Sequence, residues 1–188
     1  MALHWKLVID SRDANALADF WALALKYEVE DPSALITQLV SAGQLPQAAV
    51  VEHGGGRRFA GLAAIRHPDD PFDAVSGVGQ GRRILFQAVP EEKRAKNRLH
   101  VDAHDDAGDL DGLVTRLEAL GATRVELVDQ GPAGRWWVMR DPEGNEFCAA
   151  GSALVRHSHT PHTSPHTSQH VAKRSLEVRT GGAHDGKT

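Results

Sequence analysis

The stretch MRDPEGNEFCA, residues 139–149, determines how the rest of this chain is interpreted. Pro142 fixes its own backbone φ angle, and Gly144 and Asn145 tolerate positive φ values, so DPEGN is typical of a tight turn. The flanking segments are β-compatible and predict a hairpin over residues 135–150. By itself the turn indicates only that two strands are antiparallel neighbours. The elements upstream of it show where this hairpin lies in the order of the fold.

The hairpin closes the second of two similar runs of elements. Upstream of it, apolar spacings of three and four predict a helix at 110–120, between strands at 99–104 and 123–128. The first half of the chain has the same order, with a helix at 14–26 that Asp13 can cap. The other elements expected there are strands at 3–10, 27–30, 59–65 and 84–89 and a helix at 33–43.

The chain therefore repeats the order strand–helix–strand–strand–strand, which predicts an α+β fold of two βαβββ modules. One copy alone would leave a face of its sheet bare, whereas two copies can bury these faces and enclose a cavity. We expect one domain at residues 1–152, with modules at about 1–90 and 98–151. The stretch 41–80 has no pattern that assigns all of its elements.

The composition changes after Val155. The segment RHSHTPHTSPHTSQH, residues 156–170, has almost no apolar side chains and cannot bury enough surface to offset its ordering entropy. We therefore expect residues 153–188 to form a disordered tail rich in His, Thr and Ser. Its histidines can bind Zn, Ni or Cu weakly, but the sequence indicates no function that requires this.

Charge and cysteine content limit the class of function. From Arg156 onward the chain carries five basic and two acidic residues, which leaves 16 basic and 23 acidic residues in the body. A body this acidic is a poor nucleic-acid binder. The single cysteine, Cys148, excludes an intramolecular disulfide and fits a reducing cytoplasm. There is no recognisable signal peptide and no apolar run of the ~18–20 residues that cross a bilayer, so we expect a soluble cytoplasmic protein.

Three stretches resemble the vicinal oxygen chelate superfamily of glyoxalases, bleomycin resistance proteins and dioxygenases. They are FQAVPEEKRAKNRLHVD (86–102), LEALGATRV (117–125) and MRDPEGNEFCA (139–149). With Phe20-Trp21, the set resembles the actinobacterial glyoxalase-like branch. The resemblance implies the paired-module fold over about residues 3–151 and a small-molecule cavity between the modules.

The resemblance also implies a place for a metal ion. Metal-binding members supply up to four ligands, a His from the first strand and a Glu from the last strand of each module. These positions fall on Lys6, on Gln87 with a register uncertain by one or two residues, on His100 and on Cys148. Only His100 keeps the family's residue type, and the ammonium of Lys6 would repel a dication. We expect no metal cofactor, with a divalent metal as the disfavoured alternative.

Each candidate residue also has a structural interpretation. His100 fits a ligand, a general base or a hydrogen-bonded cavity histidine, and Cys148 fits a reactive thiol or a small buried filler. Lys6 would suit an anionic ligand, or would extend to the cavity rim. Asp102 and His104 share a strand face with His100, but a spacing of ~7 Å per two residues predicts that they lie too far apart to hold one ion.

Two classes of function stay open. The first is a metal-independent module that binds a small organic molecule in the cavity, with Lys6, Gln87, His100 and Cys148 pointing into it. The second is a lyase- or isomerase-type enzyme with a rewired site, in which His100 is the base and Lys6 or Cys148 assists. The fold hosts both, so the sequence leaves open whether the chain is an enzyme.

The geometry of the strands makes a further prediction about this cavity. Because alternate residues of a strand share a face, Val101 and Phe147 should point away from the cavity, towards the helices. The expected partner is a small-molecule ligand, and neither nucleic acid nor a membrane. A homodimer is compatible with the sequence but not required by it.

Overall fold

The computed structural model describes residues 3, 5–105 and 107–151 of the 188-residue chain. All of them lie in one unit, Met1–Arg156. The tail expected at 153–188, with its histidines, lies outside the described residues. In the part of the chain that is described, no helix is both long and apolar enough to cross a membrane.

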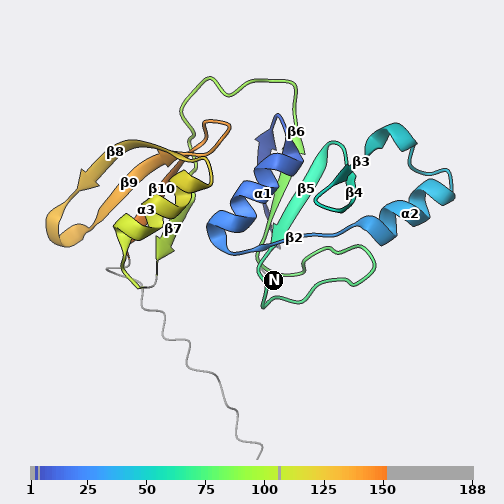
Figure 1. Ribbon diagram of the computed structural model, residues 1–188, viewed down its shortest axis with the longest axis horizontal. Helices are drawn as coiled ribbons and strands as arrows, with labels where there is room; N and C mark the ends of the chain where they lie inside the picture. The colour runs from blue at the N-terminus through green and yellow to red at the C-terminus, as the bar shows by residue number, and fades with distance from the viewer. Residues whose placement is uncertain (1–2, 4, 106, 152–188) are drawn as a thin grey trace, which may run out of the picture. The chain divides into compact units, whose positions relative to one another are not determined.

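The first module is a βαβββ unit that contains an insertion. Its own elements are β1 (Leu7–Ser11), α1 (Ala14–Leu25), β2 (Glu28–Val29), β5 (Leu62–Arg66) and β6 (Arg83–Ala88) (Figure 1). The insertion contains α2 (Ser33–Ser41), the 3-10 turn η1 (Gln47–Ala49), β3 (Val50–His53) and β4 (Gly56–Phe59). β1 pairs in parallel with β6, β6 pairs with β5, and both β2 and β4 pair with β5.

The second module repeats this order without an insertion of regular elements. It contains β7 (Asp102–Asp105), α3 (Leu110–Ala119), β8 (Thr123–Asp129), the 3-10 turn η2 (Gly131–Ala133), β9 (Arg135–Arg140) and β10 (Glu146–Gly151). Its strand order is β7-β10-β9-β8, and β7 and β10 are parallel. The order β1-β6-β5-β2 of the first module is equivalent, so the two-module α+β fold is confirmed.

Two strand boundaries differ from those that the sequence predicts. The strand expected at 59–65 is interrupted by a turn at residues 60–61, which separates β4 from β5. The strand expected at 99–104 begins only at Asp102, so His100 belongs to the connector that precedes β7. The second difference changes the interpretation of the site.

Aspartate side chains begin the two main helices. Asp13 caps α1 by accepting a hydrogen bond from Ala16 N at 3.0 Å, and Asp109 caps α3 by accepting one from Gly112 N at 2.9 Å. Lys26, with a φ of 57°, ends α1 in the left-handed conformation. The N-cap predicted for Asp13 is therefore confirmed.

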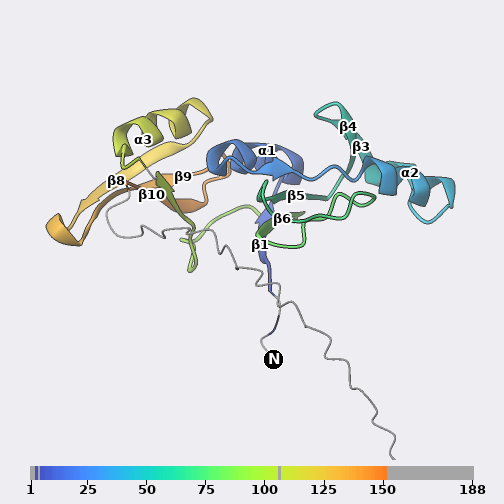
Figure 2. The same cartoon turned by 90° about the horizontal axis from the view of Figure 1, so that it is seen from below.

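The helices and sheets bury a core that includes side chains from both modules. α1 packs on β5 and β6, and α3 packs on β10 and β8, each helix covering one face of its own sheet (Figure 2). The rings of Trp21 on α1 and Phe147 on β10 meet edge to face, with centroids 5.1 Å apart. Phe147 is almost fully buried, as strand alternation predicts. Val101 packs against the same core, but it precedes β7 and also lines the groove between the modules, so the prediction that it points away from the cavity is wrong.

A buried ion pair anchors the end of the stretch 41–80, which the sequence left unassigned. The carboxylate of Glu30, which is 6% exposed, accepts hydrogen bonds from Arg83 Nε at 2.6 Å and Arg83 Nη2 at 2.8 Å. It also accepts one from the backbone N–H of Gly79 at 2.8 Å. A Cβ at Gly79 would lie 2.7 Å from the Cβ of Arg66, so this close approach needs glycine.

Candidate functional site

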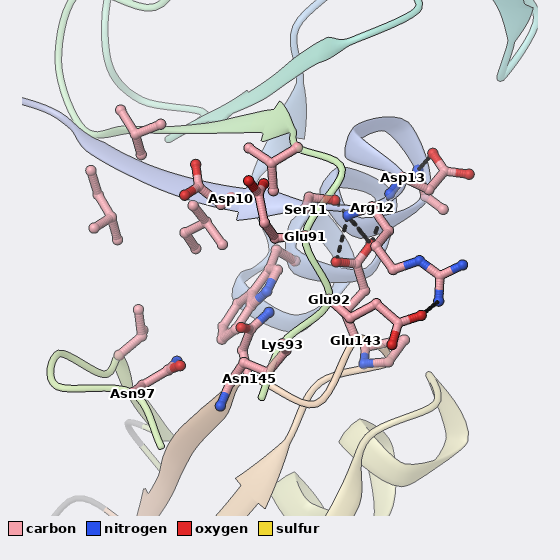
Figure 3. Close-up of a pocket in the computed structure, with 18 of the residues that line it drawn as sticks. Asp10, Ser11, Arg12, Asp13, Glu91, Glu92, Lys93, Asn97, Glu143 and Asn145 are labelled. Carbon is pink, nitrogen blue, oxygen red and sulfur yellow. Dashed lines mark hydrogen bonds and ion pairs between the residues drawn. The ribbon is translucent and has the colours of Figure 1, made fainter. Parts of the chain in front are cut away.

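A groove of about 1140 Å³ lies between the two modules. Three segments that are distant in sequence line it: β1 with the start of α1, the connector at residues 89–101, and the β9–β10 turn (Figure 3). Its apolar wall is formed by Leu7, Val8, Ile9, Trp21, Val89, Leu99 and Val101. The groove therefore combines an apolar wall with many polar and charged side chains.

The turn carboxylate of Glu143 is fully engaged at one end of the groove. It accepts hydrogen bonds from Ser11 Oγ at 2.9 Å, from Arg12 N at 2.9 Å and from Asp13 N at 2.9 Å (Figure 3). These donors lie where β1 passes into α1. Glu143 therefore links the second module to the first, and its carboxylate is already occupied by these donors.

The first residue of the DPEGN turn makes a second connection between the modules. Asp141, 3% exposed, accepts hydrogen bonds from Trp21 Nε1 at 3.1 Å and from the backbone N–H of Asn145 at 2.9 Å. Burial raises the pKa of Asp141 above its usual value, although these hydrogen bonds oppose the shift. The turn motif and the Phe20-Trp21 pair are thus in direct contact.

The connector is anchored to β10. Lys93 Nζ lies 2.8 Å from Glu146 Oε2, and the same oxygen accepts a hydrogen bond from Asn97 N at 3.1 Å. The contact with Lys93, assisted by that hydrogen bond, lowers the pKa of Glu146 to about 2. The positive charge of Lys93 is therefore already neutralised and is not free for an anionic ligand.

Two carboxylates border the groove without such partners. Asp10 on β1 and Glu91 on the connector both line it (Figure 3). Neither has a hydrogen bond or ion pair through its side chain among the residues that the structure describes. In contrast, the neighbouring Glu92 lies 3.6 Å from Arg12. The uncompensated charge of the groove is therefore negative.

A second, smaller cavity of about 220 Å³ lies on the second module. His100, Asp102 and Cys148 line it together, with His104 and Trp136 beside them. His100 lines both cavities.

Asp102 lies closer to His100 than the sequence predicts. His100 Nε2 is 3.2 Å from Asp102 Oδ1, and Cys148 is the ladder partner of Asp102. One ligand atom from each of the three side chains lies within 4.8 Å of the others. The expectation that Asp102 is too far away is wrong because His100 precedes β7 and is not held at strand spacing.

The thiol of Cys148 is poorly suited to nucleophilic chemistry. Burial, and secondarily the negative charge of Asp102, raises its pKa to about 11. The thiolate is the reactive form, so a neutral thiol at physiological pH does not favour a catalytic cysteine.

Lys6 and Gln87 are not brought together with His100 and Cys148 in either cavity. Both are exposed, and neither lines either of the two cavities described above. Gln87 is the ladder partner of Asp10, whereas Leu85 pairs with Val8. The assignment of Lys6, Gln87, His100 and Cys148 to one ligand pocket stays a prediction.

The two-module metal centre implied by the superfamily does not fit these residues. Val8 pairs with Leu85 in the first parallel ladder, and Asp102 pairs with Cys148 in the second. With Lys6 equivalent to His100, as the resemblance implies, Val8 is equivalent to Asp102 and Leu85 to Cys148, two residues before Gln87. The first module therefore offers two aliphatic side chains and the ammonium of Lys6 where the family places ligands. None of the three can bind a divalent cation.

The chain matches the glyoxalase-like domain family over residues 6–150. Its structure is similar to the fosfomycin resistance protein FosX from Mesorhizobium loti, with a TM-score of 0.51 and 12% identity over 82% of this chain and 94% of that one. FosX from Listeria monocytogenes gives a TM-score of 0.51 and 12% identity over 82% and 96% of the two chains. An enzyme of the glyoxalase/bleomycin resistance protein/dioxygenase family from Burkholderia phytofirmans gives 0.48 and 17%, over 77% and 94%.

At these identities the structural likeness shows the fold alone. No curated protein matches the chain. The family match covers most of the residues from which both modules are built, including the connector and the DPEGN turn. The chain therefore belongs to the glyoxalase-like domain family.

Proposed function

We propose that this glyoxalase-like domain binds a small organic molecule in the groove between its modules, without the two-module metal centre of the superfamily. The observation that carries the proposal is the groove itself, which has an apolar wall and two carboxylates without partners. Its volume of about 1140 Å³ is sufficient for a drug-sized molecule. The proposal needs no catalytic group, and the aliphatic residues at the first-module ligand positions do not conflict with it.

The charges of the groove favour one class of ligand. Asp10 and Glu91 lack partners among the described residues, while Lys93 is paired with Glu146 and Arg12 lies near Glu92. A ligand with an aromatic or aliphatic body and a cationic or donor group would complement this surface. The fosfomycin resistance proteins share only the fold, so their ligand is not carried over.

Filling the groove tests its role. Val8, which is 42% exposed and lines the groove, is replaced by tryptophan, and Val125 on β8, 46% exposed and outside both cavities, receives the same change as a control. Binding is measured by thermal shift and calorimetry with naphthylmethylamine, naphthylmethanol and naphthoic acid. We expect Val8→Trp to abolish binding and Val125→Trp to preserve it. Equal binding by both variants would contradict the proposed location.

The charge preference has its own test. Asp10→Asn should weaken binding of naphthylmethylamine by about tenfold and leave that of naphthylmethanol almost unchanged, because only the amine interacts with the carboxylate. Glu126→Gln serves as the control, since Glu126 on β8 is exposed and lines neither cavity. A stronger response to naphthoic acid than to the amine in the unaltered protein would show that the charge argument is wrong.

The alternative is a lyase- or isomerase-type enzyme that uses His100. The observation that favours it is the distance of 3.2 Å between His100 Nε2 and Asp102 Oδ1, because a carboxylate beside an imidazole can orient it as a base. Chemical change of a bound molecule, lost in His100→Ala while binding persists, would favour the enzyme over the binding module.

A further inference from the structure

The second module alone brings three different metal-binding side chains together. Cys148 on β10 faces Asp102 across the parallel β7–β10 ladder, and His100 approaches Asp102 from the connector. One donor atom from each lies within 4.8 Å of the other two, and all three line the smaller cavity. This convergence depends on the irregular backbone before β7, which the sequence pattern does not predict.

The donors suit a particular kind of ion. An imidazole nitrogen, a carboxylate oxygen and a thiolate sulfur are the three ligand types that Zn²⁺ uses in proteins, at about 2.0–2.3 Å from the ion. Ligand atoms of one tetrahedral site are therefore about 3.5 Å apart. Bringing the donor atoms of His100, Asp102 and Cys148 from 4.8 Å to this spacing requires side-chain movements of about 1 Å, which the exposed side chains of His100 and Asp102 can make.

We propose that His100, Asp102 and Cys148 bind one Zn²⁺-like ion inside the second module, leaving a fourth position open at the smaller cavity. When the sulfur–metal bond forms, the thiol proton is released to solvent. The thiolate and the carboxylate then balance the two positive charges of the ion. The site differs from the superfamily centre because every ligand comes from one module and because Asp102 supplies a donor.

This inference does not depend on the ligand proposed for the groove. It limits the expectation of no metal to the centre that both modules would share. That expectation rested on a centre shared by both modules, which the first module cannot complete. The site proposed here needs nothing from the first module. His100 lines both cavities, so a bound ion would fix a side chain that the small cavity and the groove share.

Cobalt(II) titration of the full chain, after treatment with a chelator, tests the site. Because Cys148 is the chain's single cysteine, a thiolate-to-cobalt charge-transfer band reports this residue alone, whatever the tail histidines bind. We expect the band to saturate at one equivalent, with proton release, and to disappear when Zn²⁺ is added. Absence of the band would overturn the proposal.

Matched variants identify the other two donors. His100→Ala and Asp102→Asn should each weaken cobalt affinity, read from the band, by about tenfold or more. His104→Ala is the control, because His104 lines the same cavity but lies outside the three-donor cluster. Thermal melting of each variant after chelator treatment confirms that the variant keeps its fold. Parental affinity in either donor variant, or an equal loss in His104→Ala, would overturn this donor set.

Discussion

The indole Nε1 of Trp21 donates a hydrogen bond to Oδ2 of Asp141 at 3.1 Å, which joins the first helix to the last turn of the domain. Both residues are almost fully buried. A buried carboxylate that loses a donor keeps its desolvation cost without compensation. Loss of this contact therefore lowers the stability of the fold by more than one hydrogen bond contributes.

Replacing Trp21 by phenylalanine should lower the free energy of unfolding by about 2–4 kcal/mol, because a hydrogen bond to a charged group and part of a buried ring are both lost. Urea denaturation followed by circular dichroism measures the change. Trp5→Phe is the control, since Trp5 is 87% exposed, and it should change stability by less than about 0.5 kcal/mol. Equal stability of the two variants would show that the Trp21–Asp141 contact is not formed.

The same contact predicts a pH dependence. Burial raises the pKa of Asp141, so its contribution to stability is greatest below its unfolded pKa and is lost as pH rises through its folded pKa. Trp21→Phe removes a donor to the ionised form and raises that pKa further. The stability deficit of the variant should therefore be largest near neutral pH and shrink as Asp141 is protonated. Urea denaturation of both proteins between about pH 4 and pH 7 measures this. A deficit that does not vary with pH contradicts the assignment.

Glu143 provides a test of how strongly the modules are coupled. Glu143→Ala leaves Ser11 Oγ and the backbone N–H groups of Arg12 and Asp13 without their acceptor, and should cost about 2–3 kcal/mol. Glu92→Ala, which alters only an exposed ion pair, should cost less than about 1 kcal/mol. Hydrogen exchange should show faster opening at the β1–α1 junction in Glu143→Ala and not in Glu92→Ala.

The Glu30–Arg83 pair predicts a larger effect. Glu30→Gln leaves a buried guanidinium without its counter-charge, and we expect a loss of about 3–5 kcal/mol in denaturant unfolding. Glu28→Gln alters the more exposed Glu28–Arg66 pair and should change stability by less than about 1 kcal/mol. If Glu28→Gln proved the more damaging of the two, the burial argument for Glu30 would fail.

The elements with strong local signals were predictable from the sequence. The periodicity of α1 and α3, the cap at Asp13 and the DPEGN turn all depend on neighbouring residues, and each matches the structure. The end of the unassigned stretch 41–80 is instead held by Glu30, which binds Gly79 N and Arg83, a residue 53 positions away. No local pattern reveals that pairing.

The candidate site was less predictable because it depends on the irregular backbone before β7 and on carboxylates that have no partner among the described residues. Regular strand spacing predicts that Asp102 lies too far from His100 to share an ion with it. His100 instead lies before β7, and its imidazole is 3.2 Å from the Asp102 carboxylate. The spacing of Asp10 and Glu91 in the sequence does not indicate that they belong to a binding site. What distinguishes them is the absence of partners among the described residues, while the neighbouring acids Glu92 and Glu143 have theirs.

The contact between Trp21 and Asp141 also bears on how the chain is made. The two residues are separated by 120 positions, so at a synthesis rate of about 5–20 residues per second Asp141 emerges about 6–24 s after Trp21. During that interval the indole and the neighbouring Phe20 have no Phe147 to pack against. Until Phe147 emerges, the part of α1 that carries Phe20 and Trp21 stays exposed, and exposed apolar surface of this kind makes a nascent chain prone to aggregation.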